Sequence, residues 1–147
     1  MIENIIMGFE NIVCDADYNR VNAAFNKYGI EGYESFYGPG IRRGIFEDFE
    51  KGKISVYQFE DEFNAFAHRR LNLGEIECLL RAHLEVDNDI LDILTELGVL
   101  FNILLMGNLN PLTMLWADSF EFSRQEYPIS LYFYKIYWSY PVSYTHL

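Results

Sequence analysis

Residues 99–111 read Val-Leu-Phe-Asn-Ile-Leu-Leu-Met-Gly-Asn-Leu-Asn-Pro, and this segment determines the architecture that we expect. The part up to Met106 is uncharged and apolar, which is typical of a buried strand. Gly107, Asn108 and Leu109 then predict a turn, and Asn110-Pro111 predicts the start of a helix, because proline in the first helical turn loses no hydrogen bond. A strand that turns directly into a helix is typical of a parallel α/β sheet.

Two further strands are predicted on either side of this segment. One lies within residues 2–14, where short apolar runs flank Gly8-Phe9-Glu10-Asn11, and its nearly uncharged sequence predicts burial on both faces. The other lies at residues 133–138. Because ligands bind at the carboxyl ends of the strands in open α/β sheets, we expect a site at residues 8–11 and 107–110.

The region between the first two strands is predicted to be helical. Asp17 is expected to cap a helix that ends at Gly29, and a short helix is expected over residues 41–49. The later helices begin with a capping box at Ser55 and Gln58, with Asn72-Leu73-Gly74-Glu75, and with Asp87. Two sets of residues are expected to face inward: Phe59, Phe63 and Phe66 in one helix, and Leu112, Leu115, Trp116 and Phe120 in another.

These elements predict a Rossmann-like α/β fold that a helical cap interrupts after the first strand. We expect residues 1–14 and 98–140 to form the core and residues 15–86 to form the cap. Residues 87–97 are a helix that returns to the core, and residues 141–147 form a tail outside the pattern.

Composition narrows the class of protein. The 147 residues are 50% hydrophobic and carry a formal net charge of −11, which predicts a folded domain and disfavours nucleic acid and anionic membranes as partners. Cys14 and Cys78 are far apart in sequence, so reduced thiols and a cytoplasmic location are expected, without a secretory signal. Residues 97–117 are uncharged, but the polar and turn-forming residues at 107–111 argue against a membrane span.

Two segments resemble the first and second motifs of the haloacid-dehalogenase-type (HAD) hydrolases. They are residues 4–13, Asn-Ile-Ile-Met-Gly-Phe-Glu-Asn-Ile-Val, and residues 105–111, Leu-Met-Gly-Asn-Leu-Asn-Pro. Residues 44–55 are similar to the cap of one subgroup, and residues 135–140 are similar to the strand before the third motif. The resemblance covers residues 2–140 and implies a phosphatase-type hydrolase that uses Mg²⁺ and a small phosphorylated substrate.

The residues that would carry this chemistry differ from the family pattern. Gly8 stands where the resemblance implies a nucleophilic aspartate, Glu10 stands at the acid/base position, and Gly107, followed by Asn108, stands where a serine or threonine is implied. The third-motif lysine is missing, and residues 141–147 follow instead. Loss of a catalytic group lowers rates by roughly 10⁴ to 10⁶. We therefore expect a truncated, catalytically impaired pseudoenzyme, and no catalytic residue is assigned.

Alternatives remain open at this point. Glu10 is a candidate metal ligand, and Asp15 is a candidate for weak metal-dependent activity, although the Asp15-Ala16-Asp17 pair is explained more simply by helix capping. A non-catalytic binding or scaffold module would instead use the cap and the aromatic C-terminal end, including Tyr134 and Trp138, with self-association through an exposed sheet edge. An unrelated α/β domain is the third alternative.

Other polar residues of the cap have simpler interpretations. His68 and His83 are expected at surface or boundary positions. Arg42 and Arg43 are explained equally well by contact with an anionic substrate and by a charged helix surface.

Overall fold

The computed structural model describes residues 3–139, which form two compact units. The first, which we call the sheet unit, comprises the residues up to Ala16 together with Leu84–Leu109 and Met114–Ser139. The second, the helical unit, comprises Asp17–His83 and Asn110–Thr113. None of the helices within residues 3–139 has the length and apolar character needed to cross a membrane.

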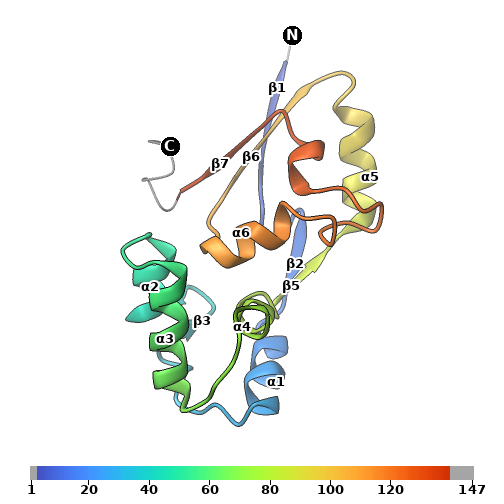
Figure 1. Cartoon of the computed structure of the whole chain (residues 1–147). Helices are drawn as coiled ribbons and strands as arrows, with labels where there is room; N and C mark the ends of the chain where they lie inside the picture. The colour runs from blue at the N-terminus through green and yellow to red at the C-terminus, as the bar shows by residue number, and fades with distance from the viewer. Residues whose placement is uncertain (1–2, 140–147) are drawn as a thin grey trace. The chain divides into compact units, whose positions relative to one another are not determined.

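A three-stranded parallel sheet organises the sheet unit (Figure 1). Its strands, in spatial order, are β1 (Asn4–Gly8), β6 (Asn102–Gly107) and β7 (Lys135–Trp138). In β1 and β6, Ile5 pairs with Ile103 and Gly8 pairs with Met106. The predicted parallel sheet, with the first strand beside the strand of the 99–106 segment, is therefore confirmed.

One face of this sheet packs into an apolar core. Ile103 and Leu105 of β6 are 1% and 0% exposed and belong to one buried cluster with Leu91 and Leu94 of α5 (Asn88–Leu97). The cluster also includes residues of α6 (Pro111–Ala117) and of the 3₁₀ helix η1 (Ile129–Tyr132). The predicted cap of α5 is confirmed, because an Asp87 carboxylate oxygen accepts the Ile90 N–H at 3.1 Å.

The opposite face of the sheet is exposed within residues 3–139. In this register, alternate residues of the three strands share the face, and Ile6 is 64% exposed while Met106 and Tyr137 are each 49% exposed. The prediction that the first strand is buried on both faces is therefore wrong for the described residues. An apolar run does not by itself specify which elements cover it.

Two pairs of short strands were not predicted. β2 (Cys14–Ala16) and β5 (Leu84–Val86) form an antiparallel pair in the sheet unit, and β3 (Tyr37–Gly38) and β4 (Ile41–Arg42) form another in the helical unit. Strands of two or three residues are too short to show an alternating pattern. The helical unit consequently begins at Asp17 instead of residue 15 and ends its long segment at His83 instead of residue 86.

The helical unit is built around an aromatic core. Its helices are α1 (Asn19–Lys27), α2 (Ile45–Glu50), α3 (Val56–Ala67) and α4 (Leu73–Leu80). Phe25, Phe49, Phe59 and Phe63 are at most 1% exposed. The rings of Phe49 and Phe59 stack with their centroids 4.1 Å apart, so α2 and α3 are joined by aromatic packing.

Side-chain capping explains where α3 and α4 begin. The capping box predicted for α3 is confirmed: Ser55 Oγ accepts the Gln58 N–H at 3.1 Å, and Gln58 Oε1 accepts the Ser55 N–H at 2.9 Å. Asn72 and Glu75 form a second such box at α4. Asp17 lies one residue before the N-cap of α1, where its carboxylate accepts the Asn19 N–H at 3.0 Å.

Two helix predictions need correction. The helix expected over residues 41–49 begins only at Ile45, because β4 pairs with β3 across Gly40, whose φ of +68° forms the turn. Leu115 and Phe120, expected to face inward, are 66% and 74% exposed. The buried stripe of α6 passes through positions 112, 113, 116 and 117, which leaves position 115 on the outer side, and the helix ends before position 120.

The two cysteines lie in different environments. Neither forms a disulfide bond within residues 3–139; Cys78 is exposed, and Cys14 is buried in the core of the sheet unit. Burial, with smaller contributions from the charges of Glu10 and Asp87, raises the pKa of the Cys14 thiol to about 12. Cys14 is therefore a small core residue and not a reactive thiol.

Replacement of Ser55 by alanine should destabilise the helical unit. The substitution removes one side of the α3 capping box, so we expect the free energy of unfolding to fall by about 1 kcal/mol. Urea denaturation followed by circular dichroism measures this change. Ser35→Ala, at an exposed position, is the control and should change the free energy by less than about 0.5 kcal/mol. Equal effects of the two variants would contradict the capping assignment.

The thiols should react at very different rates. At pH 8 a thiol with a pKa near 12 is ionised to about one part in ten thousand, so a chromogenic disulfide reagent should label Cys78 quickly and Cys14 only after denaturation. The Cys78→Ser variant should then show no fast phase. A fast phase that persists in this variant would show that Cys14 is accessible in the folded chain.

Candidate functional site at the strand ends

The carboxyl ends of β1 and β6 lie side by side. Gly8, the last residue of β1, is the register partner of Met106, so it lies beside the end of β6, whose last residue is Gly107. Gly107 in turn pairs with Trp138 of β7, and its carbonyl accepts the Ser139 N–H at 2.8 Å. The two segments that were expected to form a site, residues 8–11 and 107–110, therefore begin at neighbouring positions of one sheet edge.

A tight turn follows β1 and fixes the backbone beside Gly8. The Phe9 carbonyl accepts the N–H groups of Val13 and Cys14 at 3.0 and 3.1 Å, and the Asn11 N–H is bound by the Cys14 carbonyl at 2.6 Å. Asn11 adopts the left-handed conformation with φ of 65°, which asparagine tolerates better than most residues. Glu10 is exposed at this turn. The turn thus buries Phe9, which is 2% exposed, and directs Glu10 to solvent.

The two glycines differ in the space around them. A Cβ atom built on Gly8 would lie 3.9 Å from Ile12 Cδ1, an ordinary contact. A Cβ atom built on Gly107 would lie 2.9 Å from Phe9 Cβ and 3.1 Å from Trp138 Cζ3, which is too close. The Phe9 and Trp138 rings contact each other edge to face, with centroids 5.7 Å apart. A side chain fits at position 8, whereas aromatic groups fill the space at position 107.

The polar residues after β6 have structural roles. Asn108 is exposed. Asn110 Oδ1 accepts the Thr113 N–H at 2.9 Å, and its Nδ2 donates to Thr113 Oγ1 at 2.9 Å, so its side chain caps the start of α6. Among residues 8–11 and 107–110, the exposed polar side chains are therefore those of Glu10, Asn11 and Asn108.

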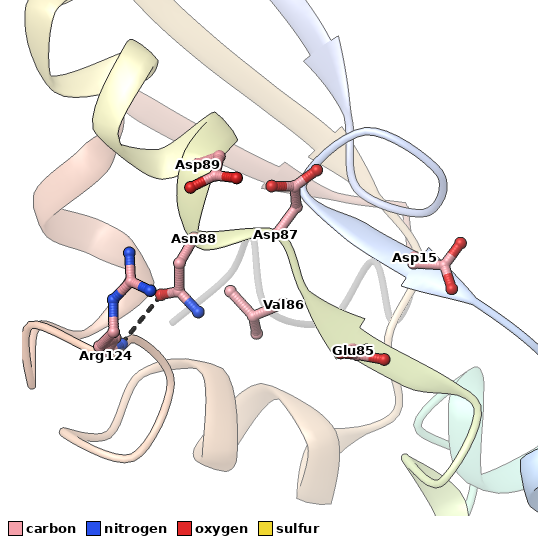
Figure 2. Close-up of a pocket in the computed structure, with 7 residues that line it drawn as sticks. All are labelled: Asp15, Glu85, Val86, Asp87, Asn88, Asp89 and Arg124. Atoms are coloured by element: carbon pink, nitrogen blue, oxygen red, sulfur yellow. Dashed lines mark hydrogen bonds between the residues drawn. The ribbon is translucent and has the colours of Figure 1, made fainter.

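Asp15 lines a separate acidic pocket of the sheet unit with a volume of about 370 Å³ (Figure 2). The lining residues are Asp15, Glu85, Val86, Asp87, Asn88, Asp89 and Arg124. Figure 2 shows that the carboxylates lie apart and do not converge on a common point. Asp87 and Asp89 stand at the first turn of α5, where negative charge stabilises the helix dipole, and the Arg124 N–H donates to Asn88 Oδ1 at 2.9 Å.

The acidic side chains of the described residues are dispersed. No group of three or more histidine, cysteine, aspartate or glutamate side chains within residues 3–139 is arranged to hold a metal ion. Mg²⁺ needs several oxygen ligands in near-octahedral geometry, and the strand ends offer the carboxylate of Glu10 without a second acidic group. Glu10, the candidate metal ligand, is thus the one acidic side chain among residues 8–11 and 107–110.

The other candidate residues lie in the helical unit. The Arg42 guanidinium donates to the Gly38 carbonyl at 2.8 Å and to Tyr18 Oη at 3.0 Å, and lies 4.1 Å from the Tyr37 ring centroid. It lies in β4, so the interpretation as part of a charged helix surface is wrong for Arg42. These contacts give Arg42 a structural role.

The two histidines differ from each other. His68 is exposed and ends α3 in the left-handed conformation, in agreement with a surface position. His83 is 3% exposed and stacks on the Tyr18 ring at 4.6 Å, so the expected surface or boundary position is wrong. The aromatic residues around position 107 were also missed, because nothing in the spacing of Phe9 and Trp138 along the chain signals that they meet.

Comparison with known proteins identifies a related phosphatase, although no protein-family model matches the chain. The chain is 32% identical over 146 residues to the D-ribitol-5-phosphate phosphatase of Bacteroides thetaiotaomicron. The match covers 99% of this chain and 71% of the relative.

Solved structures share the fold. A HAD-like family hydrolase from Porphyromonas gingivalis superposes with a TM-score of 0.82 at 24% identity, covering 95% of this chain and 67% of that chain. A HAD family enzyme from B. thetaiotaomicron, an aspartate-to-alanine mutant in complex with magnesium and inorganic phosphate, superposes with a TM-score of 0.80 at 24% identity and covers 95% and 69% of the two chains. The relative at 32% identity and the shared α/β fold show that this chain belongs to the HAD-like hydrolase superfamily.

Proposed function

We propose that this chain is a phosphatase-type member of its superfamily in which the strand ends no longer support phosphoryl transfer. The observation that carries the proposal is the pair of adjacent glycines, Gly8 and Gly107, at the carboxyl ends of β1 and β6. Ligands of open α/β sheets bind at this edge, so these positions would face a substrate.

Phosphoryl transfer through a covalent intermediate requires three contributions from such an edge. A carboxylate must attack the phosphorus, hydrogen-bond donors must stabilise the phosphoryl oxygens, and a metal ion must neutralise their charge. Gly8 offers no nucleophile, and Gly107 offers no hydroxyl. Backbone N–H groups near Gly107 and Asn108 are the donors that remain, and they cannot replace the attacking group.

The class of ligand follows from the relatives. The curated relative acts on D-ribitol 5-phosphate, and one structural neighbour holds magnesium and inorganic phosphate. A small phosphorylated compound is therefore the substrate class that the proposal assigns to any residual activity. Because the described residues do not fit Mg²⁺, no catalytic step is assigned to a metal ion in this chain. The proposal keeps the cytoplasmic location that the sequence predicts.

An activity assay tests the proposal directly. The purified chain, incubated with Mg²⁺ and either p-nitrophenyl phosphate or D-ribitol 5-phosphate, should release no phosphate above the buffer rate, because it lacks a nucleophile. The D-ribitol-5-phosphate phosphatase of B. thetaiotaomicron serves as the positive control. Turnover by the wild type that disappears in Glu10→Gln or in Asp15→Asn would refute the proposal and assign the activity to that carboxylate.

The exposed sheet face supports a second, non-catalytic role, in which two copies of the chain associate. The residues that share this face are Asn4, Ile6, Gly8, Asn102, Leu104, Met106, Lys135 and Tyr137. None of these eight carries a negative charge, although the whole chain has a formal net charge of −11. Two copies can therefore meet here without the carboxylate repulsion that other surfaces would produce.

Some aromatic residues near this face also support the core, and others do not. Tyr134 is 64% exposed, but Trp138 packs against Phe9, so a change at Trp138 would disturb the core. Ile6 and Tyr137 lie on the exposed face, and their replacement leaves the core contacts intact.

Sedimentation velocity over a range of concentrations measures the association. The wild type should shift to a dimer as concentration rises, and Ile6→Thr with Tyr137→Thr should remain monomeric, because threonine keeps the strand conformation but removes apolar surface. Tyr57→Gln, at a residue of α3 that is 72% exposed, is the control and should associate like the wild type. A wild type that stays monomeric at all concentrations would overturn this role.

A further inference from the structure

Gly8 and Gly107, at the ends of β1 and β6, differ in the space available for a side chain. Position 8 has room for a side chain, since the nearest atom to an added Cβ is the terminal methyl group of Ile12 at 3.9 Å. Position 107 has no such room, because an added Cβ would lie between Phe9 Cβ at 2.9 Å and Trp138 Cζ3 at 3.1 Å. Loss of a side chain at position 107 is thus accompanied by packing that fills its place.

The two walls around Gly107 differ in how far they can move. Phe9 Cβ is attached to a backbone that two hydrogen bonds to its own carbonyl hold in a tight turn, so it can shift only if the turn shifts. The Trp138 wall consists of ring atoms, Cζ3 at 3.1 Å and Cε3 at 3.5 Å, of a half-buried side chain. A smaller residue at 138 would remove that wall and let the end of β6 move away from Phe9 by the few tenths of an ångström that a Cβ needs.

We infer that Trp138, by holding the end of β6 against Phe9, restricts position 107 to glycine and thereby excludes a hydroxyl side chain from the end of β6. Trp138 is a positioning residue, since it acts through the space that it occupies and contacts Phe9 edge to face. The relevance of that hydroxyl to a phosphate ligand rests on the proposed function. Steric exclusion at position 107 depends only on the contacts of Phe9, Gly107 and Trp138.

A double-mutant cycle in urea tests the steric claim. Gly107→Ser should raise the equilibrium constant for unfolding about tenfold or more in the wild-type background, because the added Cβ overpacks the site. In the Trp138→Leu background, the factor by which Gly107→Ser raises the equilibrium constant for unfolding should be at least tenfold smaller. Trp138→Phe, which retains a smaller ring, provides a second background if the leucine variant does not fold. Equal costs of Gly107→Ser in all backgrounds would overturn the inference.

Two matched controls define the expected coupling. Gly8→Ser lies at the neighbouring strand end, where there is room for a side chain. It should raise the equilibrium constant for unfolding clearly less than Gly107→Ser does. Tyr134 lies one residue before β7 and is 64% exposed. Its replacement by leucine should not alter the effect of Gly107→Ser on the equilibrium constant for unfolding. A Tyr134→Leu background that relieves Gly107→Ser as much as Trp138→Leu does would show a general loosening of β7 and would refute the specific role of Trp138.

Binding of inorganic phosphate separates this inference from the proposed function. Isothermal titration with phosphate and Mg²⁺ compares the wild type with the Gly8→Asp, Gly107→Ser, Trp138→Leu triple variant. Two results together support both the role of Trp138 and the proposed function. They are energetic coupling between positions 107 and 138 in urea, and phosphate binding by the triple variant but not by the wild type. Coupling without any gain in phosphate binding supports the role of Trp138 and counts against the assignment of a former anion site. Absence of coupling overturns the role of Trp138 whatever the phosphate result.

Discussion

The parallel pairing of β6 with β1 on one side and β7 on the other is the interaction on which the rest of the structure depends. It joins residues from the two ends of the chain, since Ile5 pairs with Ile103 and Leu105 pairs with Ile136. It also sets the alternation that directs Ile103 and Leu105 into the core and leaves Met106 exposed. The adjacent strand ends, and with them the candidate site, are a direct result of this register.

The contact between Phe9 and Trp138 lies at the edge of the sheet where the proposed function places the substrate. An active hydrolase keeps polar groups at such an edge and tolerates the cost of leaving them without apolar neighbours. Here Phe9 and Trp138 pack against each other beside Gly107. Aromatic contacts of this kind add stability, and the glycine between them loses the steric freedom to accept a functional side chain.

Much of the fold was predictable because its signals are local. The helix starts at Ser55 and Asp87 follow from hydrogen bonds within three residues, and the strand before Gly107 follows from a long apolar run. Burial was less predictable, because it depends on elements distant in sequence: His83 is buried against Tyr18, and Ile6 is exposed. The glycines of the candidate site could be located from motif spacing, but the aromatic residues that fill it could not, since their contacts arise only after the strands pair.

The sheet order also bears on how the chain reaches its folded state. Ile5 must find Ile103 across 98 residues (103 − 5), and the helices of the intervening unit form from contacts much closer in sequence. Loop closure over such a span is slow compared with helix formation, so the helical unit should gain structure while the first strand is still without its neighbour. During synthesis, which proceeds from the N-terminus, an apolar strand would therefore wait unpaired for most of the chain to emerge, and in that interval aggregation and chaperone binding would compete with folding.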